Sequence, residues 1–496
     1  MNRSRILLSL LAGATAFWLA LAVTEPLGPG LDPDAMAYTY AAGTLAHGGV
    51  LRDVRDDWVS ADSTRPLTRW PPGFSAAIAL PVAAGASPVQ GARLVMAAAA
   101  FAALATLVWV VSGAAGFGAG VVLAVALLVT PAMAIVHESV LSEPLFLAAL
   151  AVTLALMARA RPAPLLEGMA AAAASLVRYA GLSAIGAVCA WELLREGAMR
   201  DRVRRSALAA LPGILANAWW WGRAAHAGGR AAVRHFSLYG QIGPTLAEGG
   251  GTLIAWAGPG LWRPWDVIVP VAIALALMLW HGNRPLASGA GRAPSAERRR
   301  VLVASGLLIL AYWALVLAAR VLADPDIPLD ERIMSPALLL LTVWVVTITA
   351  STWQEAPRAW RAAAGIAGAA WCAGSLAVTR GTVRYALETG NDYADICWTG
   401  SPVTAWVRAH GDGHALVSNA NVAIYFHTGR LARVMPDEMR ADSFKVFTDT
   451  LAARRAYVVL YDQSCAVTIE QPDSLVQALG LVPVVRLRTG SIWQTR

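Results

Sequence analysis

Two acidic residues with a proline between them, Asp32 and Asp34, follow the first long apolar run of the chain. Tyr38, Ala42 and Leu45 come next at helical spacing, which predicts an amphipathic helix beginning near Asp34. Asp is a preferred N-cap residue, so Asp34 is expected to cap this helix. A carboxylate held at a membrane surface is also suited to act as a general base, and the two roles are compatible.

The Asp-x-Asp pattern also occurs in enzymes that hold a metal ion and a sugar nucleotide. Such enzymes surround the pattern with a nucleotide-binding α/β domain on the cytoplasmic side of the membrane. Here Asp32 and Asp34 fall in a loop that we expect outside, so we reject a sugar-nucleotide site.

A third acid, Glu143, stands in the segment Ser142-Glu143-Pro144. This segment is typical of a helix start, with Ser142 as N-cap and the acid and the proline in the first turn. A functional carboxylate is the alternative interpretation. His137 and Glu138 precede it, but the second histidine of a zinc-protease motif is absent from the sequence.

Three arginines lie at or near apolar segments. Arg178 interrupts an apolar stretch, and a charge at membrane depth indicates a functional site unless it snorkels from a helix end. Arg332 opens an apolar run after Asp330 and Glu331, which predicts an interfacial anchor balanced by these two acids. Arg69, beside Trp70, is expected to lie at headgroup depth.

The composition is that of a membrane protein. Of the 496 residues 57% are hydrophobic and 15% charged, whereas soluble chains have about 25% charged residues. This excludes an ordinary cytosolic enzyme and a disordered chain. The formal net charge of +8 does not indicate nucleic-acid binding, because the arginines cluster at the ends of apolar runs.

The apolar runs predict a polytopic α-helical membrane protein with about 11 transmembrane helices. The two shortest runs flank Arg178 and could form one bent hairpin. The first run could instead be a signal peptide, although it is long for one. The runs are 6–23, 90–112, 118–136, 142–159, 165–178, 180–194, 206–222, 266–281, 301–322, 333–350 and 362–378.

The arginines predict the orientation. If the N-terminus is cytoplasmic, the inside loops hold the clusters within 159–161, 195–205, 284–300 and 358–361, as the positive-inside rule requires. The predicted location is the cytoplasmic (inner) membrane, with the C-terminus outside.

Two outside regions follow from this topology. Residues 1–379 form the membrane module with a first outside loop at 24–87, and residues 380–496 form a small extracytoplasmic α/β domain. Its expected strands are His414–Val417, Leu431–Met435, Tyr457–Tyr461 and Val482–Leu487, and its expected helices lie near 401–411, 442–455 and 473–479.

The four cysteines divide in the same way. Cys189 and Cys372 lie within apolar runs, whereas Cys397 and Cys465 both lie in the outside domain. Two cysteines in an oxidising compartment predict a disulfide between Cys397 and Cys465, and two separate buried thiols are the alternative.

Together these segments resemble the GT-C glycosyltransferases, especially bacterial relatives of protein O-mannosyltransferases and of lipid A aminoarabinose transferases. The resemblance covers roughly residues 5–350; the loop 49–69 matches no part of it, and the C-terminal domain varies among such proteins. It rests on Asp34, Tyr38, Ala42, Leu45 and Gly48, on 70–74, on 91–94, on Ser142 and Glu143, on 176–179 and on Arg332.

The resemblance implies an inverting transfer of a sugar from a polyprenyl-phosphate donor to a glycan, lipid or protein acceptor. Asp34 would then be the general base, and Arg178 and Arg332 would bind the donor phosphate. Tyr38, Arg69 and Glu143 would position the substrates. Asp32, Asp34 and Glu143 are also candidate ligands of a divalent cation.

Two other functions use the same features. A polytopic transporter or lipid flippase would line its path with the buried charges, and repeat symmetry between halves, which we do not find, would favour it. A non-catalytic assembly or sensor protein would bind its partner through the outside domain.

Overall fold

A computed structural model of the chain describes residues 3–494, except for 26, 55–63, 229–236, 241, 260–294, 354–355, 436–446, 448, 452, 454–455 and 463–479. Within these residues five helices are long and apolar enough to cross a membrane, or six if one bent pair counts as a span. The five are α1 (Arg3–Ala22), α4 (Pro88–Ala115), α13 (Ala296–Leu322), α14 (Glu331–Thr352) and α15 (Arg358–Thr389). The bent pair is α5 (Phe117–Val129) and α6 (Pro131–Glu138), at 54°.

Shorter helices occupy the remaining predicted runs. They are α7 (Glu143–Met157), α8 (Pro164–Val177), the 3-10 turn η1 (Tyr179–Gly181) and α9 (Leu182–Leu194), while α10 (Met199–His226) is long but carries several arginines. Helices thus form at ten of the eleven predicted runs, and the run 266–281 lies outside the described residues. The chain is a multi-pass membrane protein, and the count of about eleven spans stays a prediction.

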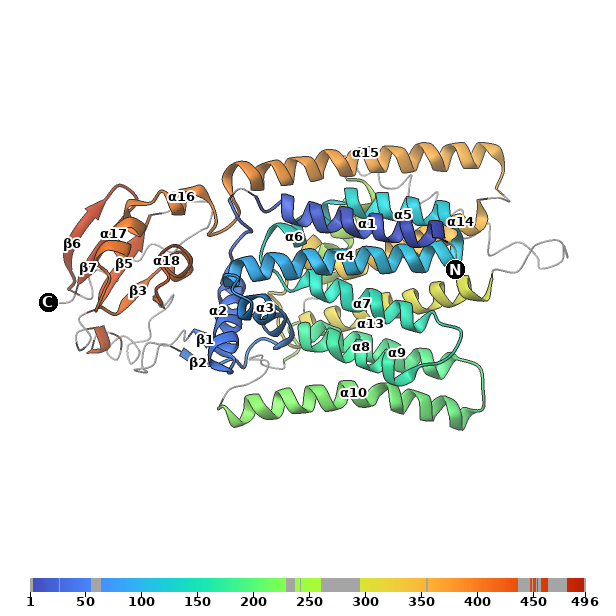
Figure 1. The fold of residues 1–496 in the computed structure, drawn as a ribbon, viewed down its shortest axis with the longest axis horizontal. Coiled ribbons are helices and arrows are strands. Elements are labelled where there is room, and N and C mark those ends of the chain that lie inside the picture. The colour runs from blue at the N-terminus through green and yellow to red at the C-terminus, as the bar shows by residue number, and fades with distance from the viewer. Residues whose placement is uncertain are drawn as a thin grey trace.

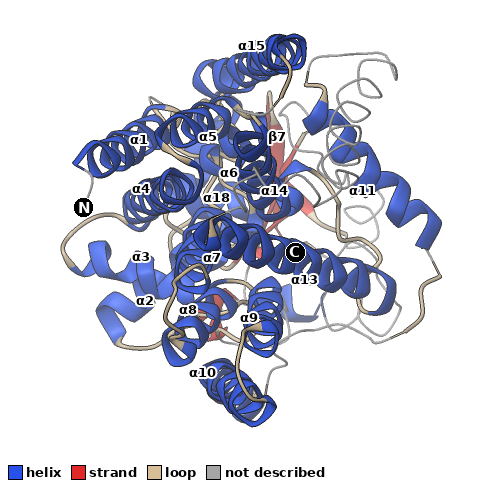
Figure 2. Cartoon of the chain, turned by 90° about the vertical axis from the view of Figure 1, so that its right-hand side faces the viewer, coloured by secondary structure: helices blue, strands red, loops and turns tan. Residues whose placement is uncertain are grey.

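The helices form a bundle along the longest dimension of the molecule (Figure 1). Helix α8 precedes Arg178 in the sequence and α9 follows it, and the two pack against each other as the predicted hairpin requires. Helix α10 covers them on the outside of the bundle (Figure 2). Two short helices, α2 (Pro33–Gly48) and α3 (Gly73–Ala83), lie at the end of the bundle that faces the C-terminal sheet (Figure 1). The N-terminus lies at the opposite end.

Arginines of the predicted inside loops cap the ends of neighbouring helices. Arg195 donates hydrogen bonds to the carbonyl of Met157, and Arg300 donates to that of Ala158, both at the end of α7. Arg298 donates to the carbonyl of Ala114 at the end of α4. The last carbonyls of a helix have no partner within it, so these arginines stabilise the ends that topology places beside them.

The C-terminal residues contain a five-stranded sheet. Its order is β4 (Arg433–Val434), β3 (Leu416–Ser418), β5 (Tyr457–Tyr461), β7 (Gly490–Gln494) and β6 (Val482–Leu487). The pairs β4–β3 and β3–β5 are parallel, and β5–β7 and β7–β6 are antiparallel. The sequence predicted all of these strands except β7. The helices of this region are α16 (Ile396–Thr399), α17 (Pro402–His410) and α18 (Asn421–Thr428). Outside it, β1 (Arg52–Val54) and β2 (Thr64–Pro66) form an antiparallel pair, and α11 (Ile242–Ala257) contacts α13 and α14.

Two predictions for this region fall largely on residues that the structure does not describe. Most of the helix expected near 442–455 and all of that near 473–479 lie outside the described residues. Cys189 and Cys372 have free thiols. Cys465 also lies outside the described residues, so its disulfide with Cys397 stays a prediction.

Candidate active site

Asp32, and not Asp34, caps helix α2. Asp32 Oδ1 accepts a hydrogen bond of 2.6 Å from the backbone N–H of Ala35, and Pro33 is the first residue of the helix. The expectation that Asp34 caps the helix is therefore wrong, because proline prefers the first helical position and the cap must precede it. Residues 35–39 of α2 are all buried, so this part of the helix is buried on all sides and not on one face. Asp34 lies in the first turn with its side chain free of any capping role.

Glu143 begins helix α7 and is almost completely buried, with its side chain 1% exposed. Its Oε2 lies 2.6 Å from Arg178 Nη1, and its Oε1 accepts a hydrogen bond of 2.6 Å from Arg332 Nε. Ser142 precedes the helix as expected, but its side chain makes no capping hydrogen bond. A buried carboxylate needs such charged partners, so Glu143 joins the two arginines.

Arg178 lies where the chain leaves α8 and turns into η1 and α9. Its backbone is extended, and its guanidinium points into the bundle to Glu143 and to Ser142 Oγ, at 2.9 Å from Nη1. The guanidinium thus contacts groups of the bundle directly after the end of α8. The hydroxyl of Tyr38 lies 3.3 Å from the same serine oxygen.

Arg332 lies in the first turn of α14 and reaches away from its sequence neighbours. Asp330 Oδ1 accepts from the N–H of Ile333 and caps the helix. The guanidinium of Arg332 instead contacts Glu143, Asp34 Oδ2 at 3.3 Å from Nη2, and Asp32 Oδ2 at 3.6 Å from Nη1. The alternative of an anchor balanced by Asp330 and Glu331 is thus wrong, because the guanidinium contacts carboxylates of α2 and α7 instead.

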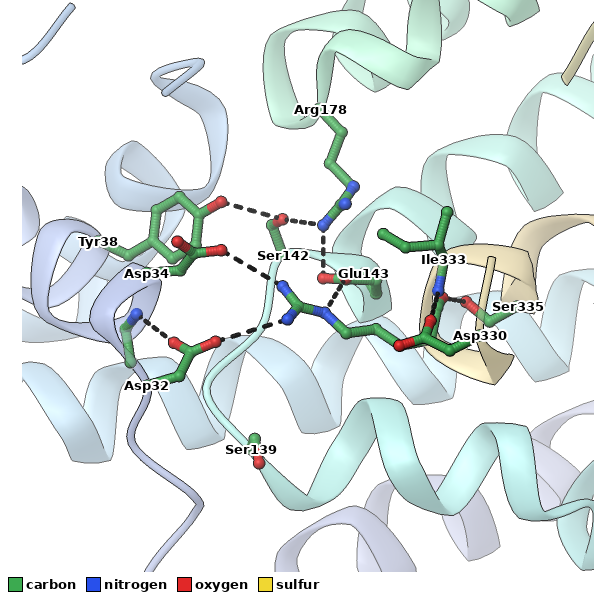
Figure 3. Close-up of polar contacts among 12 residues, drawn as sticks. Asp32, Asp34, Tyr38, Ser139, Ser142, Glu143, Arg178, Asp330, Ile333 and Ser335 are labelled. Carbon is green, nitrogen blue, oxygen red and sulfur yellow. Dashed lines mark hydrogen bonds and ion pairs between the residues drawn. The ribbon is translucent and has the colours of Figure 1, made fainter. Parts of the chain in front are cut away.

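These contacts form one continuous series, which we call the contact chain (Figure 3). It runs from Tyr38 through Ser142, Arg178, Glu143 and Arg332 to Asp34 and Asp32. Its members come from the starts of α2, α7 and α14 and from the break after α8. The contact chain includes every residue predicted to act in catalysis, phosphate binding, substrate positioning or metal binding, except Arg69.

Arg69 lies outside the contact chain and is connected to it through the ring of Trp70. Its side chain is exposed, and its guanidinium carbon stands 5.2 Å from the centre of the Trp70 ring. Trp70 in turn packs against Tyr38, with ring centroids 5.9 Å apart, and Phe74 meets Tyr38 edge-on at 5.1 Å. These rings fix the position of Tyr38, and Arg69 borders the site.

The three candidate metal ligands Asp32, Asp34 and Glu143 share one cation, the guanidinium of Arg332. Within the residues that the structure describes, no group of three or more His, Cys, Asp or Glu side chains is arranged to hold a metal ion. A divalent ion between these carboxylates would have to replace Arg332. In the described residues a guanidinium and not a metal ion neutralises these carboxylates, and the divalent cation stays a prediction.

Burial, together with the nearby charge of Asp34, raises the pKa of Asp32 to about 7, against the opposing effect of Arg332. The proton therefore binds more tightly in the folded state than in the unfolded one. Stability from this group is complete below the ordinary value of 3.8 and is lost as the pH rises through about 7.

Replacing Asp32 with Asn should therefore raise the melting temperature more at pH 8 than at pH 5. Asn keeps a capping oxygen for the N–H of Ala35, and it removes the ionisation that costs stability. Thermal unfolding of purified protein at the two pH values is the measurement. A variant that melts below the wild type at pH 8 would show that the charge of Asp32 is stabilising.

No protein-family model matches the sequence, and no curated protein matches it. Solved structures do share its fold. ArnT from Cupriavidus metallidurans bound to undecaprenyl phosphate has a TM-score of 0.58 and 11% sequence identity, with 99% of this chain and 97% of that chain covered. The mycobacterial arabinofuranosyltransferase AftD has a TM-score of 0.60 and 16% identity, with 100% of this chain and 40% of that chain covered.

A third structure is the oligosaccharyltransferase AglB from Archaeoglobus fulgidus, in complex with an inhibitory peptide and a dolichol-phosphate. It has a TM-score of 0.53 and 11% identity, with 90% of this chain and 69% of that chain covered. At such low identities the likeness concerns the fold alone. The fold is that of the GT-C glycosyltransferases, as the resemblance in the sequence predicted.

Proposed function

We propose that the protein transfers a sugar from a polyprenyl-phosphate donor to an acceptor at the outer face of the cytoplasmic membrane. The observation that carries this proposal is the pairing of Arg178 and Arg332 on one buried carboxylate, with Asp34 beside Arg332. Two guanidinium groups held in place suit a phosphate, and a nearby carboxylate suits a proton acceptor. The fold supports the proposal, because two of the similar structures contain a polyprenyl-type lipid phosphate.

In this proposal each charged residue has one role. Arg178 and Arg332 bind the phosphate of the donor, and Glu143 holds their guanidinium groups in position before the lipid arrives. Asp34 accepts the proton of the acceptor hydroxyl; among the described residues its Oδ1 has no hydrogen-bond partner. Tyr38 and Arg69 border the space in which the sugar and the acceptor meet.

In the proposed transfer, these residues account for the proton that is removed and for the lipid phosphate that leaves. The proton of the acceptor hydroxyl moves to Asp34 as the oxygen attacks the anomeric carbon of the sugar. The bond between that carbon and the phosphate oxygen breaks, and its electron pair leaves on the lipid phosphate, whose charge the two arginines stabilise. Attack opposite to the leaving group inverts the anomeric configuration.

The same proposal places the chain in the membrane. Residues 1–379 form the transferase module, with the N-terminus in the cytoplasm, and residues 380–496 form an outside domain. The arginine-capped ends of α4 and α7 would face the cytoplasm. The contact chain would then lie at the outer leaflet, where a lipid donor presents its sugar.

Binding of undecaprenyl phosphate to the purified protein tests the phosphate site. We expect the lipid phosphate to raise the melting temperature in detergent, and undecaprenol, which has the same chain without the phosphate, to have little effect. Equal effects of the two lipids would show that the protein recognises the hydrocarbon chain alone, and the phosphate site would be wrong.

A further inference from the structure

The two residues before Asp32 lie between two other segments of the chain. The N–H of Gly30 donates to the carbonyl of Glu138 at 2.7 Å, and the N–H of Val140 donates to the carbonyl of Gly30 at 2.9 Å. On the other side, the N–H of Tyr393 donates to the carbonyl of Leu31 at 3.1 Å. Both pairings are parallel. We call the segments 30–31, 138–140 and 392–393 the parallel clamp.

Two segments of the clamp lead directly into the contact chain. Asp32 and Asp34 follow 30–31, and Ser142 and Glu143 follow 138–140 (Figure 3 shows the path from Ser139 to Glu143). The clamp therefore sets the register between Asp34 and Glu143, which both bind Arg332. The third segment, 392–393, comes from the junction between α15 and the C-terminal sheet.

The clamp restricts the residue type at two positions, Gly30 and Asp392. A Cβ on Gly30 would collide with Ser139 Oγ and lie 2.9 Å from Asn391 Cβ, so only glycine allows the three segments to approach. Among the described residues, Asp392 is the only non-glycine residue with a positive φ, at 51°. Asp and Asn tolerate this conformation better than other side chains do.

The side chain of Asp392 faces the catalytic segments. Ser139 Oγ donates to Asp392 Oδ2 at 3.5 Å, across the clamp. Asp32 is surrounded by the charges of Asp34, Arg332 and Asp392 and by the N–H of Ala35, and the charge of Asp392 contributes to the raised pKa of Asp32. Asp392 thus contacts, through Ser139, the segment that leads to Ser142 and Glu143.

We propose that Asp392 is a positioning residue of the transfer site, which acts through the parallel clamp on Asp34 and Glu143. The proposal rests on the function proposed above. It makes the C-terminal junction part of the active site, so that the outside domain and the membrane module are coupled at this point.

The test compares Asp392→Asn with Asp392→Ala and with the control Asp395→Asn. Asn tolerates the positive φ and keeps an oxygen for Ser139, but it removes the charge. Ala removes the charge, the oxygen and the tolerance of the backbone conformation. Asp395 lies three residues away, where it caps α16 through the N–H of Cys397, a role that Asn also fills.

The first readout is the binding of undecaprenyl phosphate. Asp392→Ala should weaken it only modestly, because Arg178, Arg332 and Glu143 all remain. Asp392→Asn and Asp395→Asn should bind the lipid phosphate as the wild type does.

The second readout is transfer. Asp392→Ala should lower kcat on the order of 10-fold to 10²-fold, the loss that a small misplacement of reacting groups produces, while changing donor KM less. Asp392→Asn should keep most of the wild-type kcat, because it retains an oxygen for Ser139 and tolerates the positive φ. Wild-type kcat in Asp392→Ala, or equal losses of kcat in the two variants, would overturn the positioning role alone. A wild-type protein that binds no undecaprenyl phosphate at any pH would overturn the proposed function as well.

Discussion

Replacing Asp34 with Asn should remove most of the transfer activity and leave the protein folded. The variant keeps the size of the side chain and loses the proton acceptor, and general-base catalysis contributes about 10²-fold to 10⁴-fold. The fold should tolerate the change, because Asp32 and not Asp34 caps α2. The measurement is the turnover of purified variants with a polyprenyl-phosphate donor, beside their melting temperatures and their affinity for undecaprenyl phosphate.

Asp32→Asn is the matched control for this experiment. It changes the neighbouring acid of the same motif, which contacts Arg332 at the longer distance of 3.6 Å, and its loss of transfer should be milder. Wild-type turnover in Asp34→Asn would mean that another group accepts the proton and that Asp34 serves only to hold Arg332.

Replacing Arg178 with Ala should weaken the binding of undecaprenyl phosphate by roughly 10-fold to 10²-fold, the equivalent of one lost charge-assisted hydrogen bond. Glu143 keeps Arg332 as its partner, so the buried carboxylate does not lose all of its countercharge. Lys at position 178 should restore binding only in part, because an ammonium group lacks the planar fork of donors that guanidinium offers to a phosphate. Lipid-dependent thermal shifts of the purified variants provide the measurement.

Arg93→Ala is the control for the loss of an arginine. Arg93 has the same 20% side-chain exposure as Arg178 and also pairs with a carboxylate, Glu25, but it lies outside the contact chain. Its removal should leave lipid binding unchanged. If Arg178→Ala and Arg93→Ala bind the lipid phosphate equally well, Arg178 is not a phosphate ligand.

Helices were the most predictable part of this fold. A membrane span must satisfy its backbone internally and must be apolar over its length, so runs such as 90–112 and 301–322 show where α4 and α13 lie. The strand β7 was missed because Gly490–Gln494 is short and begins with glycine. Its pairing with β5 and β6 fixes it in the sheet.

The role of Asp32 as the N-cap of α2 could also have been predicted from the sequence. A proline at the first helical position places the cap on the residue before it, and Pro33 therefore identifies Asp32 as the cap. The helical spacing of Tyr38, Ala42 and Leu45 suggested that the helix begins at Asp34, so the cap was assigned to the wrong acid. The side chain of Asp34, which has no capping role, is the feature that the proposed base requires.

The partners of Arg332 were beyond prediction from its neighbourhood. Asp330 and Glu331 are adjacent in sequence, yet the guanidinium binds Glu143 and Asp34, which are 189 and 298 residues away. Such contacts depend on how α2, α7 and α14 pack. The resemblance to GT-C enzymes named these residues, but their joint contact with one arginine appears only in the folded chain.

Release of polyprenyl phosphate from its sugar tests the central claim most directly. The purified protein is reconstituted in liposomes, and labelled polyprenyl-phosphate sugars extracted from the cells that make this protein are added. The assay is run with and without a cell-envelope extract as the source of the acceptor. We predict that the wild type releases polyprenyl phosphate only when the extract is present, and that Asp34→Asn releases almost none. Movement of intact lipid-linked sugar between the leaflets without cleavage, equal in both proteins, would contradict a transferase and indicate a flippase.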